Sequence, residues 1–263
     1  MRCIDTIELL PASWRSELAN ASLESVRSGL SGASVFRVHK AISPDRFLKV
    51  ATSTDAEQLP REIVRTGWLR SHGVNVPPIV RTLWQPDVAA ILMAALPGEL
   101  VGHSTLPPGK VVTALAREFS TLHSLEIESC PFDESLAVRL ARARSAICQG
   151  KVDPAEFDQG NLGLTPEELF QRVIDTIPPI EDTVVVHGDA TFSNILIDAQ
   201  ERIGFLDCGH SGTADRYVDL APIASEIEHH YGKRWVSVFF KRYGRTKLDC
   251  NKVRSFLDLY EFF

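Results

Sequence analysis

The stretch from residue 184 to 209, VVVHGDATFSNILIDAQERIGFLDCG, carries three oxygen-bearing side chains at a defined spacing. A β-branched strand ends in His-Gly-Asp at Asp189, Asn194 follows five residues later, and Asp207 comes after two further short apolar runs. Carboxylate and amide oxygens suit Mg²⁺, which proteins hold through few side chains plus phosphate oxygens. A remaining carboxylate can accept a proton from an attacking hydroxyl. The stretch therefore predicts a magnesium site at which a hydroxyl is activated.

This spacing resembles the catalytic loop of kinases, in which an Asp stands five residues before a metal-binding Asn and a second Asp-x-Gly follows. Gly188 stands where protein kinases have Arg, and an HGDxxxxN loop is similar to that of the small-molecule kinases of the aminoglycoside and choline kinase group. The resemblance implies that Asp189 orients and deprotonates the acceptor hydroxyl, while Asn194 and Asp207 hold Mg²⁺. The implied nucleotide is ATP, with GTP as the alternative.

The whole chain has an ordinary globular composition, with 263 residues, 44% hydrophobic residues and a net charge of −6. An acidic chain is not expected to bind nucleic acid broadly. The longest apolar run, 88–96, is nine residues, far short of the roughly 20 that a membrane helix needs. Five cysteines without a CxxC pair and a polar N-terminus without an apolar leader predict free thiols and a cytoplasmic location.

The charge is divided unevenly at Pro97-Gly98. Residues 1–97 carry 11 Lys and Arg against 9 Asp and Glu, and residues 98–263 carry 17 against 25. Such a split suggests that one part faces an anion and the other a cation, although an acidic soluble surface is an equally good explanation of charge alone. We expect a nucleotide-binding lobe over 1–97 and a catalytic and substrate-binding lobe over 98–263.

Hydrophobic periodicity predicts a strand-rich first lobe and a mainly helical second lobe. In the first lobe, strands are expected at 24–30, 35–39, 46–51, 79–83 and 88–94, and one helix at 55–71. In the second, helices are expected at 111–125, 134–147, 166–177 and from 215 onward, with short strands at 183–186, 195–197 and 203–206. Together with the catalytic-loop resemblance, this pattern predicts an α+β, bilobal protein-kinase-like fold.

The first lobe contains a lysine where a kinase-like fold needs one. Lys49 lies within the apolar strand FLKVA, and Glu62 follows 13 residues later on the expected helix. A lone lysine in a strand is more often a guard against edge pairing. In a kinase-like fold, however, this lysine binds the α- and β-phosphates and the glutamate orients it.

Two further segments of the first lobe are candidates for nucleotide contacts. The loop 28–34, with Ser31 and Ser34, lacks the GxGxxG pattern, but its backbone N–H groups and hydroxyls can cover phosphates. A plain hairpin turn explains it equally well. From its position in a kinase-like fold, the run 91–96 is expected to contact adenine through the backbone of Ala94 and Leu96.

The rest of the second lobe narrows the resemblance to one family. Four segments carry it: CPFD at 130–133, GFLDCG at 204–209, ADRYxD at 214–219 and the terminal LYEFF at 259–263. Together they resemble an aminoglycoside 3′-phosphotransferase from about residue 35 to the end. The resemblance implies transfer of the ATP γ-phosphoryl group to the 3′-hydroxyl of an aminoglycoside, which confers antibiotic resistance.

The family's substrates are polycationic, so the resemblance implies an acidic pocket. Carried over by position, Glu156 and Asp158 lie in the loop before the 166–177 helix, and Glu226 lies in the helix after ADRY. Glu261 and the α-carboxylate of Phe263 would close the pocket. Taken singly, each is most simply a solvated surface acid.

Several positions depart from the family pattern. His210 stands where Arg commonly follows Asp-Cys-Gly, and Tyr260 and Gln159 stand where acids are frequent. Fewer carboxylates suggest a narrower range of substrates, and a histidine can be neutral near pH 7. His187 is expected to orient the catalytic loop, and Cys208 to be a packing residue.

Two alternative functions also fit the sequence. The catalytic loop is compatible with a kinase of another small cation, such as choline or an amino sugar, and a nucleotide-binding pseudokinase would act through partners. Among aminoglycosides, a 2-deoxystreptamine drug such as kanamycin is favoured over streptomycin. We expect a monomer or a weak dimer that binds neither nucleic acid nor membrane.

Overall fold

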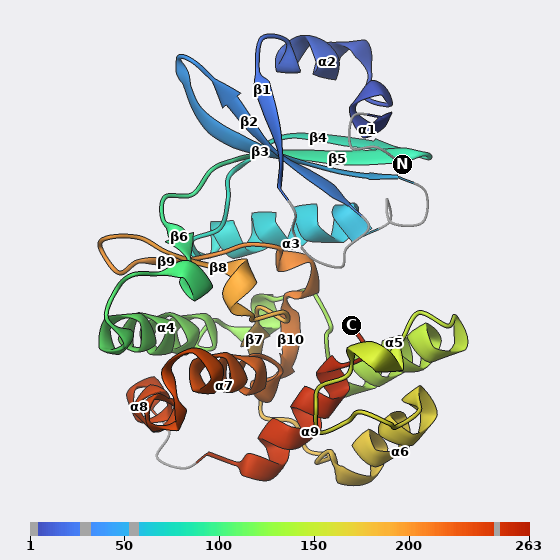
Figure 1. Ribbon diagram of the computed structural model, residues 1–263, viewed down its shortest axis with the longest axis vertical. Helices are drawn as coiled ribbons and strands as arrows, with labels where there is room; N and C mark the ends of the chain where they lie inside the picture. Colours follow the sequence, from blue (N-terminus) through green and yellow to red (C-terminus); the bar gives the residue numbers. More distant parts are fainter. Residues whose placement is uncertain (1–4, 27–32, 53–57, 245–247) are drawn as a thin grey trace. The chain divides into compact units, whose positions relative to one another are not determined.

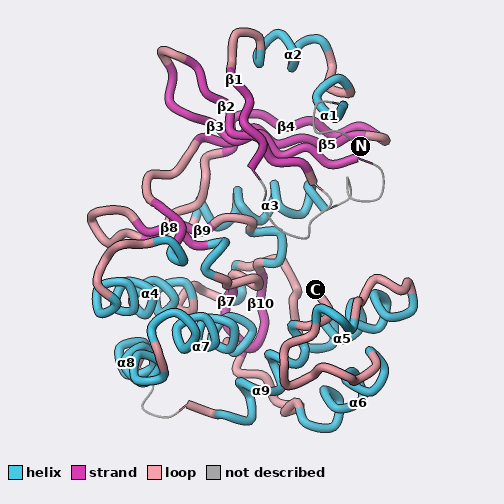
Figure 2. The backbone as a smooth tube through the Cα atoms, in the orientation of Figure 1, coloured by secondary structure: helices cyan, strands magenta, loops and turns pink. Residues whose placement is uncertain are grey.

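The computed structural model describes residues 5–26, 33–52, 58–244 and 248–263. The chain forms two compact units, one made of Met1–Pro97 with Gly204–Gly209 and the other of Gly98–Ile203 with His210–Phe263. The segment Gly204–Gly209, which the sequence boundary assigns to the second lobe, thus packs with the first unit. Strands predominate in the first unit and helices in the second (Figure 2).

The first unit is built on a five-stranded antiparallel sheet with the strand order β1-β2-β3-β5-β4 (Figure 1). Its strands are β1 (Ser22–Val26), β2 (Ser34–Lys40), β3 (Ser43–Thr52), β4 (Ile79–Gln85) and β5 (Val88–Ala94). The predicted strands are confirmed, although residues 27–30 of the first lie outside the described ranges. Ser34 begins β2, where it pairs with Val50, instead of lying in the preceding loop.

Helices cover both faces of this sheet. The helix α3 (Gln58–Ser71) was expected, but α1 (Asp5–Glu8) and α2 (Ala12–Leu18) were not. Leu10, Trp14 and Leu18 pack on one sheet face, together with side chains of β2, β3 and β5. On the other face, Leu59 of α3 packs against the sheet. The first lobe therefore has three helices in its described part instead of one.

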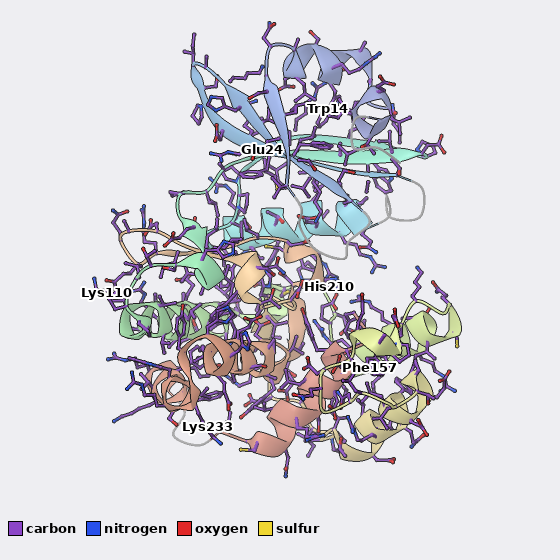
Figure 3. The ribbon with its side chains drawn as sticks, in the orientation of Figure 1. Trp14, Glu24, Lys110, Phe157, His210 and Lys233 are labelled. Atoms are coloured by element: carbon purple, nitrogen blue, oxygen red, sulfur yellow. The ribbon has the colours of Figure 1, made fainter. Side chains whose placement is uncertain are left out.

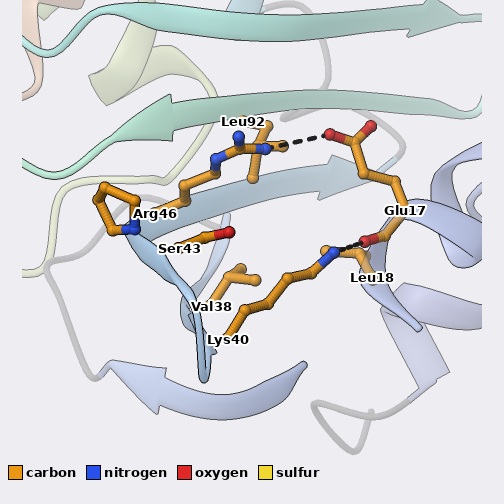
Figure 4. A pocket seen from close by; sticks show the side chains of 8 residues that line it. Glu17, Leu18, Val38, Lys40, Ser43, Arg46 and Leu92 are labelled. Atoms are coloured by element: carbon orange, nitrogen blue, oxygen red, sulfur yellow. Dashed lines mark hydrogen bonds and ion pairs between the residues drawn. The ribbon is translucent and has the colours of Figure 1, made fainter. Parts of the chain in front are cut away.

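A pocket of about 260 Å³ lies on the α2 side of the sheet (Figure 4). Lys40 and Arg46 line it, and both contact Glu17 of α2: the Lys40 ammonium reaches the Glu17 carbonyl at 2.5 Å and the Arg46 guanidinium the Glu17 carboxylate at 3.2 Å. Successive side chains of a strand point to opposite faces. Lys49, three residues after Arg46, therefore faces α3. The pocket does not include Lys49, the candidate nucleotide-binding lysine.

The second unit is mainly helical. Its helices are α4 (Pro108–Leu122), α5 (Leu136–Cys148), α6 (Pro166–Thr176), α7 (Tyr217–Tyr231), α8 (Lys233–Tyr243) and α9 (Cys250–Tyr260), and its short strands are β6 (Glu99–Leu100), β7 (Thr183–Val186), β8 (Ile195–Ile197) and β10 (Gly212–Asp215). The strand β9 (Ile203–Phe205) lies where the chain passes from the second unit to the first. Within the described ranges, no helix is both long and apolar enough to cross a lipid bilayer.

Local signals explain most of these elements. Thr165 and Glu168 form the capping box expected at the start of α6: the Thr165 hydroxyl accepts from the Glu168 N–H at 3.2 Å, and the Glu168 carboxylate accepts from the Thr165 N–H at 2.8 Å. The strand β10 was not expected, because its sequence GTAD has no β-branched apolar pattern. It pairs antiparallel with β7 and so supports the strand that ends in the His-Gly-Asp tripeptide.

The packing of Trp14 against the sheet provides a test of the first unit. Trp14 is 2% exposed and Trp84 is 74% exposed, and Figure 3 shows Trp14 beside the sheet. Trp14→Ala is expected to lower the free energy of unfolding by about 3 to 5 kcal/mol, because it leaves a cavity in the core. The control Trp84→Ala should change it by less than about 0.5 kcal/mol. Urea unfolding checks both, and equal effects would contradict this packing.

Candidate active site

A buried cluster of charges occupies the α3 side of the first unit. The ammonium of Lys49 on β3 donates to Glu62 Oε2 on α3 at 2.8 Å and to Asp207 Oδ1 at 3.0 Å. The Lys49 and Glu62 side chains are only 8% and 6% exposed, while Asp207 is 37% exposed. The structure thus brings together the lysine and the glutamate selected from the sequence. It adds the second aspartate of the 184–209 stretch to the same cluster.

The neighbouring carboxylates keep Lys49 charged. Burial alone would lower the pKa of Lys49, but the charges of Glu62 and Asp207 outweigh it and raise the pKa above its ordinary value. A fixed cation in a partly open cluster can bind phosphate oxygens. Asp207 has a left-handed backbone with φ of 52°, a conformation that non-glycine residues adopt at a cost and often at functional positions.

The segment that carries Asp207 is hydrogen-bonded to the rest of the first unit both before and after this residue. Arg65 of α3 donates to the Gly209 carbonyl at 2.8 Å, and the Phe205 N–H donates to the Asn75 carbonyl at 2.9 Å. Cys208 between them is 1% exposed, and burial raises the pKa of its thiol. Cys208 is therefore an unreactive packing residue, as expected from the sequence.

Ser31, Ala94 and Leu96 are the other candidate nucleotide contacts of the first unit. Ser31 lies outside the described residues. The Ala94 N–H already donates to the Pro78 carbonyl at 2.9 Å. This residue can therefore offer adenine only its carbonyl oxygen, and Leu96 is the better candidate for a donor.

In the second unit, Asp189 lies at the end of β7 with both carboxylate oxygens engaged. Its Oδ2 accepts from Asn194 Nδ2 at 2.8 Å, and its Oδ1 accepts from the Tyr260 hydroxyl at 2.5 Å. Asn194 Nδ2 also reaches the Asp189 carbonyl at 3.2 Å. The pairing of Asp189 with Asn194 was anticipated by their spacing. The contact with Tyr260 was not, because 71 residues separate the two in sequence.

The buried carboxylate of Asp219 holds this loop in place. Its Oδ2 accepts from the His187 N–H at 2.7 Å and from His123 Nε2 at 3.1 Å, and its Oδ1 accepts from the Gly188 N–H at 2.8 Å. Burial would raise the pKa of Asp219, but the hydrogen bond and charge of His123 outweigh it, so the pKa lies below its usual range. His187 Nδ1 in turn accepts from the Asp189 N–H at 3.3 Å, which supports its expected orienting role.

Gly188 is required by the close approach of the following segment. Its φ is 90°, and a Cβ built there would lie 1.9 Å from the His210 carbonyl oxygen. No larger residue fits without moving this backbone. This explains why the loop has Gly where protein kinases have Arg.

A second cation, Arg139 on α5, lies beside the loop and was missed in the sequence. Arg139 is 4% exposed and donates to the Gly188 carbonyl at 3.1 Å. Its guanidinium also lies 5.7 Å from the centre of the Phe263 ring. Burial and then the charge of Arg139 lower the pKa of His210 to about 4. His210 (Figure 3) is therefore neutral at pH 7, and the positive charge here comes from α5.

The acidic candidates come together only in part. Glu261 accepts from the Asp158 N–H at 3.0 Å and from Asn161 Nδ2 at 2.7 Å. Glu226 on α7 is partly buried, and its charge acts on the Tyr260 phenol. Glu156 lies on an exposed turn (Pro154–Glu156), and no contact among the described residues joins its side chain to the others. Phe263 is 41% exposed.

No compact metal-binding cluster is present in the described parts of the chain: nowhere there do three or more His, Cys, Asp or Glu side chains gather as ligands. Mg²⁺ usually needs only one or two protein oxygens, because phosphate and water supply its other ligands. The Asn194 amide meets that requirement. Because its Nδ2 is engaged by Asp189, its Oδ1 is the atom available to a cation.

A buried strand lysine paired with a helix glutamate, and an Asp-x₄-Asn loop after a short strand, are the parts that kinase-like phosphotransferases use. Comparison with known proteins agrees with this class. The family model described as "Phosphotransferase enzyme family" (APH) matches residues 22–256, and the chain belongs to that family.

Three relatives illustrate the similarity. The aminoglycoside 3′-phosphotransferase of Niallia circulans is 33% identical over 258 residues, which cover 95% of this chain and 98% of that protein. The crystal structure of the type VIII aminoglycoside 3′-phosphotransferase matches with a TM-score of 0.88 and 31% identity over 99% of both chains. The aminoglycoside phosphotransferase APH(3″)-Id of Streptomyces rimosus, solved with ADP and streptomycin, matches with a TM-score of 0.84 and 25% identity over 100% of this chain and 99% of that chain.

These similarities confirm the expected kinase-like α+β fold, with a small strand-rich lobe and a larger, mainly helical one. They also confirm the family resemblance. The roles of individual residues remain predictions.

Removing the Asp219 charge tests how the loop is held. Asp219→Asn leaves the His187 or the Gly188 N–H without an anionic acceptor. It should lower the free energy of unfolding by about 2 to 4 kcal/mol and turnover by about tenfold or more. Asp175→Asn on the exposed face of α6 is the matched control and should change neither. Normal stability and turnover in Asp219→Asn would contradict this anchoring role.

The lowered pKa of His210 predicts a pH-dependent stability. Between about pH 6.5 and 4 the unfolded chain binds a proton at His210 that the folded protein does not. The contribution to stability is therefore full above pH 6.5 and is lost as the pH falls towards 4. Relative to His210→Gln, the wild-type protein should lose about 1 to 2 kcal/mol more unfolding free energy over this range. Urea unfolding at several pH values measures this.

The exposed His103 provides the control. His103→Gln should follow the wild-type pH dependence. If His210→Gln also follows it, His210 titrates normally in the folded protein and the electrostatic account of this position is wrong.

Proposed function

We propose that this phosphotransferase transfers the γ-phosphoryl group of ATP to a hydroxyl of an aminoglycoside antibiotic, the 3′-hydroxyl by similarity to its relatives, and so confers resistance. The observation that carries the proposal is the geometry of Asp189, a carboxylate fixed at a strand end by Asn194 and by the anchored loop. Relatives at 33% identity and nearly full coverage carry the name aminoglycoside 3′-phosphotransferase.

Asp189 acts on the acceptor. One carboxylate oxygen accepts a hydrogen bond from the attacking hydroxyl and takes its proton as the oxygen–phosphorus bond forms. The Asn194 amide fixes the other oxygen, so the carboxylate presents one defined face. Such transfers depend mainly on positioning and on neutralising charge.

The first-unit cluster acts on the nucleotide. Lys49, held by Glu62 at 2.8 Å, binds phosphate oxygens of ATP. The Ala94 carbonyl and the Leu96 N–H would contact the adenine, and the hydroxyl of Ser34 would lie over the phosphates. Support for a nucleotide of this type comes from the ADP in the Streptomyces rimosus structure. We favour ATP over GTP on this basis.

Asn194 and Asp207 are the residues that would hold Mg²⁺. Asn194 has its Oδ1 available, and Asp207 carries a carboxylate that is 37% exposed. Both offer the hard oxygen ligands that Mg²⁺ prefers. When bound, the metal neutralises charge on the transferring phosphate.

Carboxylates of the second unit would hold the acceptor's amines. Glu261, Asp158 and Glu226 supply negative charge to a unit that has seven more acidic than basic residues. Glu156 could join them only from its exposed turn. Charge attraction captures a polycation and orients its hydroxyl. We further propose that the enzyme works in the cytoplasm as a monomer or weak dimer.

The identity of the acceptor can be settled by comparing several candidate substrates. The Streptomyces rimosus protein binds streptomycin, whereas the 3′-phosphotransferases are the relatives of higher identity. We therefore expect phosphorylation of kanamycin and neomycin, and little of streptomycin. Phosphorylation of choline instead would favour a choline kinase, and nucleotide binding without phosphorylation of any of these acceptors would favour a pseudokinase.

Asp189→Ala provides the direct test of the proposed chemistry. Without its carboxylate the acceptor hydroxyl loses its proton acceptor and its orientation, so turnover with kanamycin should fall by about 10² to 10⁴ or more. Nucleotide binding, measured by calorimetry, should persist. Asp175→Ala is the matched surface control. Retained turnover in Asp189→Ala would overturn the assignment of the base.

A further inference from the structure

The phenol of Tyr260 is hydrogen-bonded to Asp189, the residue proposed to accept the proton of the acceptor hydroxyl. Tyr260 is the last residue of α9, and its hydroxyl donates to Asp189 Oδ1 at 2.5 Å. The other oxygen, Oδ2, accepts from Asn194 Nδ2 at 2.8 Å. Each carboxylate oxygen therefore already has a partner, and an acceptor hydroxyl that takes the phenol's place on Oδ1 must displace the phenol.

The phenol is the partner that can leave. Asn194 belongs to the same loop as Asp189 and bonds both its carboxylate and its backbone carbonyl, the latter at 3.2 Å. Moving Asn194 would break two bonds within the loop. Tyr260 comes from another element and meets Asp189 through one hydroxyl. Moving it leaves the loop intact.

The phenol remains a donor throughout the working pH range. Burial, followed by the charge of Asp189, raises the pKa of Tyr260 above its ordinary value of 10. A protonated phenol mimics a substrate hydroxyl in both chemistry and hydrogen-bond direction. It differs in one respect, since its oxygen is fixed to the end of a helix.

The turn that follows Tyr260 connects it to the proposed amine-binding residues. The neighbouring Glu261 accepts from Asn161 Nδ2 at 2.7 Å and from the Asp158 N–H at 3.0 Å. Phe263 donates its N–H to the Tyr260 carbonyl at 3.2 Å. An amine that binds Glu261 competes with these contacts, and so acts on the turn that positions the phenol.

We propose that Tyr260 is a gate at the acceptor position: its hydroxyl occupies Asp189 Oδ1 in the acceptor-free enzyme, and the acceptor hydroxyl replaces it. This deepens the proposed function and rests on it.

One consequence is protection of ATP. A water on Asp189 Oδ1 could attack the γ-phosphorus, giving its proton to the carboxylate as the bond to the ADP oxygen breaks. The phenol holds this position against water.

The second consequence concerns specificity. An acceptor hydroxyl must replace the hydrogen bond from the Tyr260 phenol to the charged carboxylate of Asp189. A hydroxyl on a molecule with no other binding group competes poorly for this carboxylate. A hydroxyl carried by a molecule whose amines also bind Glu261 does so with additional binding energy. The gate therefore selects hydroxyls that come with cationic groups.

Tyr260→Phe removes only the hydroxyl and tests the gate. We expect KM for kanamycin to fall by about threefold to tenfold, since the acceptor no longer competes with a charge-assisted hydrogen bond. The kcat should stay within about twofold, because Asp189 and Asn194 are unchanged. ATP hydrolysis without acceptor should rise by about threefold or more, because a water can now occupy Oδ1.

Two further variants control the result. Tyr231→Phe removes a phenol on α7 whose hydroxyl meets the Val101 carbonyl at 3.5 Å, and it should leave KM and hydrolysis as in the wild type. In Asp189→Asn/Tyr260→Phe the gain in hydrolysis must disappear, since the water loses its proton acceptor. Circular dichroism and the melting temperature establish that each variant is folded.

The outcomes separate this inference from the proposed function. A raised KM, or a kcat reduced tenfold with unchanged hydrolysis, would mean that the phenol binds the acceptor or positions Asp189, and would overturn the gate. If the wild type phosphorylates no aminoglycoside, the proposed function fails. The comparison of acceptor-free ATP hydrolysis then still decides the gate, because equal rates in wild type and Tyr260→Phe contradict it.

Discussion

The carboxylate of Asp219 is the constraint on which the catalytic loop depends. It lies fully buried at the start of α7 and accepts the N–H groups of His187 and Gly188, so that the chain leaving β7 can follow only one path. A buried charge is costly unless its hydrogen bonds are complete. Here two backbone donors and His123 complete them. The direction in which Asp189 points is a consequence of that buried charge.

The surroundings of buried ionisable side chains have opposite effects on charge in the two units. In the first, two carboxylates keep a buried lysine charged, and we propose that this lysine holds phosphate. In the second, a buried arginine lies behind the catalytic loop, and the histidine beside it is kept neutral. Arg139 thus offsets the negative charge of the second unit near the catalytic loop, whereas the negative charge at the C-terminal turn is not offset in this way. We propose that a cationic acceptor binds at this turn.

Sequence reasoning succeeded where a signal is local. The strand β5 and the capped helix α6 follow from periodicity and capping, and the spacing of Asp189 and Asn194 led to the catalytic loop. It failed where partners are distant in the chain. Nothing near Tyr260 indicates that its phenol meets Asp189, 71 residues away. Short elements such as α2 and β10 also gave no clear pattern, because their form depends on the sheet or strand against which they pack.

The central claim is that Asp189 activates a hydroxyl of an aminoglycoside for attack on ATP. The most direct measurement is to incubate the protein with ATP, Mg²⁺ and kanamycin and to locate the transferred phosphate by NMR. The account predicts a single product phosphorylated on the 3′-hydroxyl, formed only when Asp189 is intact. A product phosphorylated elsewhere would contradict the assigned regiochemistry, and no phosphorylated drug with a folded, ATP-binding protein would contradict the claim itself.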